Sequence, residues 1–257
     1  MLLTCPVQTT EFLSAKGLGV EVHIGRDDVR PGWEQYIPFV GGVHLPYAKL
    51  NLAALDADLR NNSIQAIQDA MDTGSRYGIP YMVMHTCGTE SSEFQQVGSY
   101  RNLIDSIGTL ADYAAGKGIT LCIENAALHQ PKRRVYGIFA QEWFQIQQDV
   151  ACPNVLLTLD TSHAATSAAM LHYRPEDRFA YLYEYLKHPE RIGRVHWSDS
   201  RLSGGEAYFG DLHLVPGQGD LPRDFHRKIL ALEAVKTLEQ RCSEAELSPG
   251  LDFIQTL

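Results

Sequence analysis

The chain has 257 residues, of which 44% are hydrophobic and 21% charged, so it can bury one sizeable core. Its formal net charge of −9 gives no sign of the basic surface typical of nucleic-acid binding, and no apolar run reaches the roughly 18–20 residues of a membrane span. Five cysteines without a CxxC spacing argue against a disulfide framework or a structural zinc site. No secretory signal is visible, so we expect a cytoplasmic protein with a single domain over residues 1–257.

Short apolar runs rich in β-branched residues alternate along the chain with longer stretches of helical periodicity. The predicted strands are Leu2–Val7, Gly19–Ile24, Gly42–Pro46, Tyr81–His85, Thr120–Asn125, Val155–Thr161, Arg194–Ser198 and Val235–Arg241. Two intervening segments, 62–77 and 99–117, repeat apolar residues at helical spacing. Gly78 and Gly118 follow these segments, where a glycine commonly ends a helix.

Repeated alternation of strand and helix predicts a parallel α/β architecture. About eight repeats over this length favour a closed (β/α)8 TIM barrel over an open, doubly wound sheet. No glycine-rich fingerprint follows the first strand, which argues against a dinucleotide-binding fold.

Imidazole and carboxylate side chains lie at or just beyond the ends of the predicted strands. These residues are His44, His85, Glu124, Asp160, His163, His196, Asp211, His213 and Glu239. Because the C-terminal ends of barrel strands converge on one face, we expect all nine in one bowl. In the last strand Glu239 is preferred to Glu233, because residues 230–233 complete a helix that begins near Pro222, whereas residues 235–238 have strand character.

One histidine or glutamate at a strand end is usually a hydrogen-bonded polar residue of the core. Nine such groups buried together would be costly unless cations compensated their charge. A mixed set of imidazoles and carboxylates suits Zn or Mn better than Ca or Mg. Because nine ligands exceed the need of one ion, we expect two or three ions.

The segments HLPYAKLNLA, HTCG, CIENA, LDTSHA, HWSDS and DLHLVPGQGD, between about Gly42 and Glu239, resemble signatures of the xylose-isomerase-like barrel superfamily. This superfamily includes sugar isomerases and epimerases and endonuclease IV. In the isomerase and epimerase branch, the resemblance implies one central metal held by Glu124, Asp160, His196 and Glu239, with the two glutamates also moving protons. In endonuclease IV it implies three zinc ions, held by His44, His85 and Glu124, by Glu124, Asp160, His196 and Glu239, and by His163, Asp211 and His213.

Two N-terminal segments depart from the endonuclease IV pattern. A GxHxS segment and an early DNA-contacting loop of that family correspond here to LLTCPVQTT and VEVHIGRDDVRPGWEQY, and neither pattern is present. One residue is also inserted between Tyr47 and Asn51. These departures leave the ligand set intact and argue against recognition of abasic DNA.

Two functions fit the nine residues. The first, which the sequence favours, is isomerisation or epimerisation of a sugar or sugar phosphate. A metal would acidify the C–H bond beside a carbonyl, and Glu124 and Glu239 would act as a two-base pair. The second is phosphoester hydrolysis of the endonuclease IV type, for which Asp211 and His213 argue. A dehydratase, a lyase or a binding module without catalysis are the remaining alternatives.

Tyr47, Lys49 and Trp197 are the candidate substrate-binding residues. Lys49 could hold a phosphate or hydroxyl group, whereas Trp197 could instead pack in the barrel wall. His23 could line the bowl or be a buried, hydrogen-bonded histidine. The basic run 132–134 is typical of a solvated loop, with a phosphate clamp as the alternative. We expect a small-molecule partner rather than DNA.

Overall fold

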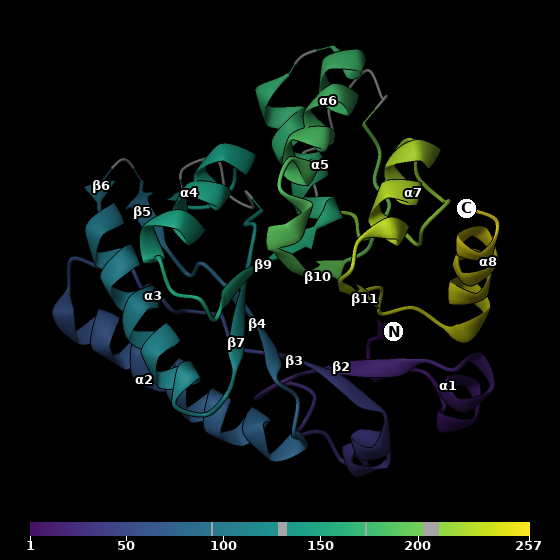
Figure 1. Ribbon diagram of the computed structural model, residues 1–257, viewed down its shortest axis with the longest axis horizontal. Coiled ribbons are helices and arrows are strands. Elements are labelled where there is room, and N and C mark those ends of the chain that lie inside the picture. Colours follow the sequence, from purple (N-terminus) through teal and green to yellow (C-terminus); the bar gives the residue numbers. More distant parts are fainter. Residues whose placement is uncertain (94, 128–132, 173, 203–210) are drawn as a thin grey trace.

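Eight parallel strands close into a barrel in the computed structural model, which describes residues 1–93, 95–127, 133–172, 174–202 and 211–257 (Figure 1). Around the barrel the strand order is β1-β11-β10-β9-β7-β4-β3-β2, and each neighbouring pair is parallel. The strands are β1 (Leu2–Thr4), β2 (Gly19–His23), β3 (Val40–His44), β4 (Tyr81–His85), β7 (Thr120–Glu124), β9 (Val155–Asp160), β10 (Ile192–His196) and β11 (Val235–Leu238). The predicted (β/α)8 barrel is confirmed.

The first and last strands are shorter than the sequence predicted. β1 ends at Thr4, ahead of Pro6, which has no N–H group with which to extend a ladder. β11 ends at Leu238, and two residues later the Gln240 amide donates to the carbonyl oxygen of Trp197 at 3.1 Å. The chain therefore leaves the barrel just before Glu239.

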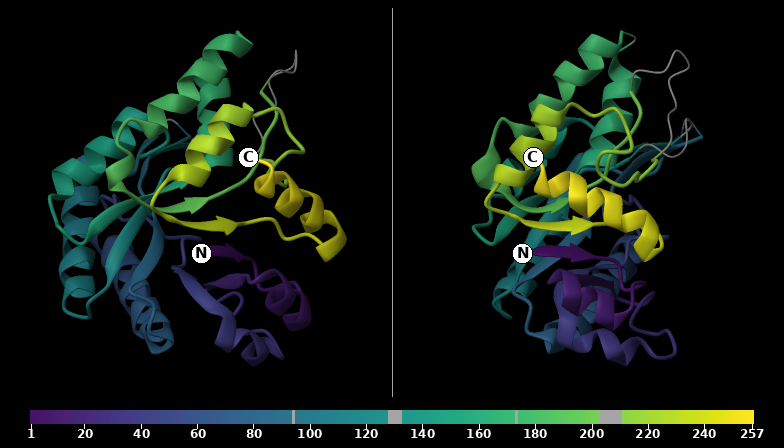
Figure 2. Two further views of the ribbon diagram at one scale, coloured as in Figure 1. Left: turned by 45° about the vertical axis from the view of Figure 1, so that its right-hand side comes forward. Right: turned by 90° about the vertical axis from the view of Figure 1, so that its right-hand side faces the viewer.

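Helices cover the outside of the barrel, and none of those in the described residues combines the length and apolar character needed to cross a membrane (Figure 2). The α-helices are α1 (Thr10–Lys16), α2 (Ala57–Gly74), α3 (Tyr100–Ala115), α4 (Ala140–Val150), α5 (Thr161–Leu171), α6 (Pro175–Leu182), α7 (Arg223–Ala231) and α8 (Glu244–Gln255). The 3-10 helices are η1 (Trp33–Phe39), η2 (Ser75–Tyr77), η3 (Tyr183–Leu186) and η4 (Pro189–Arg191). Only η1 connects β2 to β3, so this repeat lacks an α-helix.

The two helices with the clearest sequence periodicity begin at side-chain caps. Asp56 accepts hydrogen bonds from two backbone N–H groups at the start of α2, and Ser99 accepts one at the start of α3. The cap at Asp56 begins α2 five residues before the predicted segment. Gly78 and Gly118 both have φ of +68°, the left-handed conformation expected of glycines that end helices.

A small antiparallel sheet joins two loops above the barrel. It consists of β5 (Thr89–Ser92), β6 (Gln95–Gln96) and β8 (Arg133–Val135), in the order β6-β5-β8. It ties the loop after β4 to the loop after β7, and the sequence analysis did not predict it. One consequence is that Arg133 is fixed next to the segment that follows His85.

A buried ion pair crosses the barrel interior beneath the predicted bowl. Glu21 on β2 and Arg194 on β10 are each 1% exposed, and the Arg194 guanidinium donates to Glu21 Oε2. Gly42 on β3 leaves the space for this pair: an added Cβ would lie 2.1 Å from Arg194 Nη2 and 2.6 Å from Glu21 Oε2. The Gly42 position therefore tolerates no side chain without displacement of the pair.

We expect Gly42→Ala to lower the free energy of unfolding by about 1–3 kcal/mol, because overpacking would displace a buried ion pair. Urea denaturation would measure the change. Gly108→Ala is the matched control, since the new Cβ would meet no atom within 4 Å on helix α3 and should leave stability unchanged or raise it by up to about 1 kcal/mol. Equal stability of both variants would contradict the packing described.

Candidate metal centre

The C-terminal ends of the strands bring the nine predicted residues to one mouth of the barrel. Five of them end strands β3, β4, β7, β9 and β10, in that order: His44, His85, Glu124, Asp160 and His196. Glu239 directly follows β11, His163 lies in the first turn of α5, and Asp211 and His213 precede α7. Glu233 is exposed in the bend before β11, whereas Glu239, the residue preferred from the sequence, lies 3.1 Å from His196 at the bowl.

The central group surrounds His196. Its Nδ1 atom lies 3.1 Å from Glu124 Oε1, 3.1 Å from Glu239 Oε2 and 3.9 Å from Asp160 Oδ2. One ring nitrogen can donate at most one hydrogen, so it cannot satisfy three carboxylates. One ligand atom from each of these four residues lies within 4.8 Å of the others, and a cation held among them would satisfy all three carboxylates.

A second group lies on the β3 and β4 side of Glu124. The Nε2 atoms of His44 and His85 lie 3.3 Å and 3.2 Å from the same oxygen, Glu124 Oε2. Nδ1 of His44 donates to the backbone carbonyl of Leu45 at 2.8 Å, which leaves Nε2 to face the carboxylate. Burial lowers the pKa of His85 to about 3, so this ring is neutral near pH 7 and available as a metal ligand.

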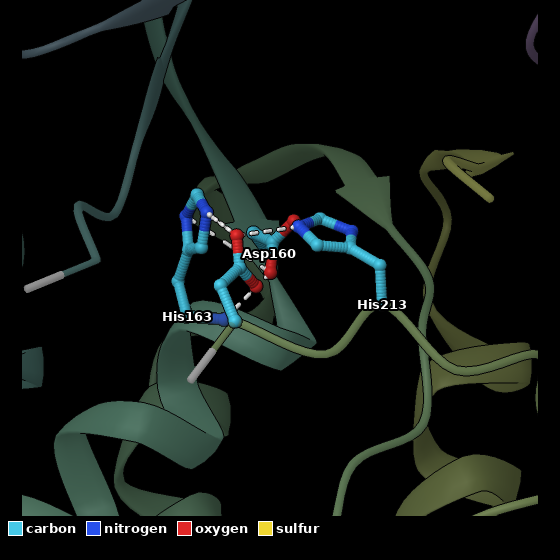
Figure 3. Close-up of side chains that lie close together, drawn as sticks. Asp160, His163 and His213 are labelled. Atoms are coloured by element: carbon cyan, nitrogen blue, oxygen red, sulfur yellow. Dashed lines mark hydrogen bonds and ion pairs between the residues drawn. The ribbon is translucent and has the colours of Figure 1, made fainter. Parts of the chain in front are cut away.

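A third group consists of Asp160, His163, Asp211 and His213, whose ligand atoms also lie within 4.8 Å of one another. Figure 3 shows the side chains of Asp160, His163 and His213 directed toward one another. Asp211 Oδ2 lies 2.7 Å from His213 Nε2 and 3.3 Å from His163 Nε2. Nδ1 of His163 contacts the Asn125 carbonyl at 2.7 Å, so Nε2 faces the group.

The unpaired carboxylate oxygens and the protonation of the histidines at this mouth are both consistent with a site for divalent cations. Three buried carboxylate oxygens make no hydrogen bond within the described residues: Asp160 Oδ2, Asp211 Oδ1 and Glu239 Oε2. Although burial opposes protonation of His163 and His196, neighbouring carboxylates raise the pKa of both rings well above the usual value. Protons on these rings thus compensate the carboxylates in the metal-free protein, and metal binding would displace them.

Burial also raises the pKa of Asp160 to about 6, against the opposing influence of His163 and His213. For Glu239, burial likewise favours the neutral form, but His196 brings the pKa down to about 2. Glu239 is therefore ionised near pH 7. A carboxyl group with a raised pKa and another with a lowered pKa in the same cleft are typical of a functional site.

His23 also lies at this mouth. Its ring stacks on that of His44 with centroids 4.0 Å apart and an angle of 6° between the planes. Its Nε2 atom lies 3.6 Å from Glu239 Oε1. Of the two alternatives left by the sequence, His23 therefore lines the bowl, and it forms a further possible ligand group with His44 and Glu239.

Sequence analysis missed Glu21. Its Oε1 atom accepts a hydrogen bond from His196 Nε2 at 2.8 Å, which directs Nδ1 of the same ring toward the central group. Its Oε2 atom accepts from Arg194 and, at 3.3 Å, from the Thr237 hydroxyl. A carboxylate behind a ligating histidine fixes the tautomer and orientation of the ring. A charged residue in the middle of the apolar strand GVEVH was the signal available in the sequence.

The three predicted substrate-binding residues have different positions. Tyr47 is 43% exposed, and its ring stacks on His85 with centroids 4.3 Å apart. Lys49 lines a hollow next to His85. Trp197 corrects the expectation: its side chain is fully buried, and its indole N–H donates to His226 at 2.9 Å, so it packs in the barrel wall and borders no substrate. Of the basic run 132–134, residue 132 lies outside the described residues.

A family model described as "Xylose isomerase-like TIM barrel" matches residues 33–257. The chain belongs to this family. A probable endonuclease 4 from Thermoplasma acidophilum is 26% identical over 179 residues, which are 70% of this chain and 58% of that protein. An uncharacterised protein from Methanocaldococcus jannaschii is 23% identical over 160 residues, which are 56% of this chain and 54% of the relative. The chain thus spans less than two thirds of the length of these curated relatives.

Solved structures of similar fold fall on both branches of the superfamily. A D-tagatose 3-epimerase-like protein has a TM-score of 0.73 at 17% identity, covering 99% of this chain and 95% of its own. Endonuclease IV from Thermus thermophilus has a TM-score of 0.64 at 19% identity, covering 99% and 97%. Another protein of that organism, soaked with zinc chloride, has a TM-score of 0.67 at 20% identity, covering 99% and 96%. At these identities the likeness shows the fold alone.

We expect Glu21→Gln to weaken zinc binding about 10–100-fold, because an amide holds the His196 ring less firmly than a carboxylate does. Competition with a chromophoric chelator would measure the affinity on folded protein, and urea denaturation would measure stability separately. Glu34→Gln is the control, since it removes one charge from an exposed residue of η1. Unchanged zinc affinity in Glu21→Gln would show that the His196 orientation does not depend on this contact.

Proposed function

We propose that this chain is a metal-dependent phosphoester hydrolase with a multinuclear centre, zinc being the preferred ion and manganese the alternative. The proposal takes the nine predicted residues as ligands and adds His23 at the edge of the set. It places the chain with the hydrolytic branch of its superfamily, whereas the sequence alone favoured isomerisation or epimerisation.

The environment of Glu124 is the observation that supports hydrolysis best. Its Oε1 atom lies 3.1 Å from His196 Nδ1 and 3.4 Å from His163 Nδ1. Its Oε2 atom lies 3.3 Å from His44 Nε2 and 3.2 Å from His85 Nε2. Both oxygens are thus engaged on opposite sides, and the side chain is 1% exposed. A two-base mechanism needs one oxygen of this carboxylate to take a proton from substrate, whereas imidazoles lie against both oxygens here, as would suit a carboxylate that binds metal through both.

Residues of this chain have distinct parts in the proposed reaction. Divalent cations, when bound at the mouth, would supply the Lewis acidity that activates water and neutralises phosphate charge. Water adds to phosphorus and gives up a proton, the P–O bond to the leaving alcohol breaks, and the leaving oxygen takes up a proton from solvent. Glu239 has 17% of its side chain exposed, and its Oε1 atom can accept the proton that water releases, because Oε2 faces the central group. Tyr47 flanks the opening beside His85.

Isomerisation or epimerisation of a sugar or sugar phosphate is the second candidate. Glu124 and Glu239 both lie 3.1 Å from His196 Nδ1, so both carboxylates belong to the central group that a one-metal, two-base site would use. The third group then has no assigned part, because a single central ion uses Glu124, Asp160, His196 and Glu239 alone. The third group is therefore where the two candidates differ.

Substrate preference can be tested directly. We expect the zinc-loaded protein to hydrolyse an activated phosphodiester and to lose this activity on chelation. The same preparation should be assayed on a panel of ketose phosphates and on a duplex containing an abasic site. Conversion of a ketose phosphate to its epimer, without phosphate release from any ester, would favour the second candidate.

The double variant Asp211→Ala/His213→Ala tests the number of ions used. In a multinuclear hydrolase it should lose one bound ion, measured by elemental analysis, and kcat should fall by orders of magnitude. A one-metal isomerase would keep its ion and change mainly in KM. The matched control is His188→Ala/Glu190→Ala, which removes an exposed histidine–carboxylate pair at 3.6 Å. This control should keep both metal content and kcat.

Metal removal should also lower stability, because bound cations relieve the repulsion among the buried carboxylates. We expect free zinc at about 100 times its Kd to stabilise the protein by about 2.7 kcal/mol, seen as a rise in Tm. The Asp211→Ala/His213→Ala variant should show a smaller rise. A Tm independent of zinc and of chelator would contradict a metal site here.

A further inference from the structure

A hollow of about 280 Å³ opens beside His85, next to the metal centre. Its walls come from the segment after β3, the segment after β4, the start of the loop after β7, and β8. The volume lies near the lower end of small-molecule pockets, so it suits one sugar-sized unit with its substituent. A second hollow, of about 510 Å³, continues outward and shares Lys49, Leu50, Thr89 and Arg133 with the first.

The two hollows share two cations. Lys49 and Arg133 are 84 positions apart in sequence and line both hollows, and no carboxylate lines the inner one among the described residues. The described carboxylates form no ion pair with either cation, whereas the neighbouring Arg134 is 2.9 Å from Glu90 and 3.0 Å from Glu142. In a chain with net charge −9, two unneutralised cations on one wall favour an anionic ligand.

The local fold fixes the side chain of Arg133 and constrains the backbone of Lys49. Nε of Arg133 donates to the Thr89 hydroxyl at 3.0 Å, and Nη2 donates to the same oxygen, so the guanidinium has a fixed direction. Lys49 has φ of +64°, a conformation that a residue with a side chain seldom adopts unless its surroundings require it. Cys87, on the wall of the same hollow, has φ of +46°.

We propose that this hollow is an anion subsite, in which Lys49 and Arg133 bind a second, non-reacting phosphate of the substrate while the reacting phosphoester lies at the metal centre. The inference rests on the proposed function, because it describes the same substrate. It narrows the substrate class to compounds with two phosphate groups about one sugar unit apart. Guanidinium and ammonium groups are suited to such a group, the first by paired hydrogen bonds and the second as a point charge.

Calorimetric titration of the zinc-loaded, full-length protein with inorganic phosphate tests the subsite. We expect two classes of binding, one at the metal centre and one at the hollow. Lys49→Met/Arg133→Gln should lose the second class and keep the first, whereas Asp211→Ala/His213→Ala should retain the second. Lys16→Met/Arg134→Gln, which removes two cations that line neither hollow, should titrate like the wild type. Identical titrations of Lys49→Met/Arg133→Gln and wild type would overturn the subsite.

The binding assay separates this inference from the proposed function. Phosphate binding that depends on Lys49 and Arg133, in a protein without hydrolase activity, would support the subsite and contradict the function. The source of the phosphate is distinguished with two probes, a pentose bisphosphate and a single-stranded oligonucleotide. Lys49→Met and Arg133→Gln should each weaken binding of the probe that uses the subsite roughly tenfold. No change with either probe would contradict the assignment.

Discussion

The need to neutralise one buried carboxylate, Glu124, determines how the side chains at the mouth of this barrel are arranged. Glu124 is 1% exposed, and burial alone would favour its neutral form, yet the surrounding imidazoles hold its pKa well below the usual range. Two of these rings use the other nitrogen on a fixed acceptor, His44 on the Leu45 carbonyl and His196 on Glu21. His44 and His196 therefore face Glu124 with the nitrogen that a cation would use. The contacts that neutralise the Glu124 carboxylate therefore also orient these rings as metal ligands.

The same constraint extends one layer down the barrel. His196 connects the two layers, because its Nδ1 atom faces the carboxylates at the mouth and its Nε2 atom donates to Glu21. Glu21 in turn needs Arg194, since a lone buried carboxylate would be costly. Arg194 then needs the space that Gly42 leaves on the opposite strand. A glycine in the lower layer is thus linked through two side chains, Arg194 and Glu21, to the orientation of the candidate metal ligand His196.

Strand ends were predictable from the sequence, but the direction of side chains within strands was not. Strands of a parallel barrel are buried on both faces, so they lack the alternation that would have marked Glu21 as pointing inward and Trp197 as pointing outward. The β6-β5-β8 sheet was also missed, because its strands are two to four residues long and β5 pairs with β8 from a different loop. In the sequence, Arg133 was therefore visible only as part of a basic run, although the fold brings it close to Lys49.

Backbone strain is concentrated where the fold serves the site. Among the described residues, five other than glycine have positive φ: Lys49, Cys87, Glu93, Ala151 and His213. Lys49 and Cys87 line the inner hollow, and His213 belongs to the third ligand group. Left-handed backbone at a residue with a side chain is unfavourable and persists only where the surroundings require it.

Among these residues, Ala151 merely ends a helix, so its conformation needs no functional reason. Lys49, Cys87 and His213, by contrast, all lie at the ligand groups or on the wall of the hollow beside them. That coincidence favours one extended site, with cations of the protein on one side and its carboxylates and imidazoles on the other.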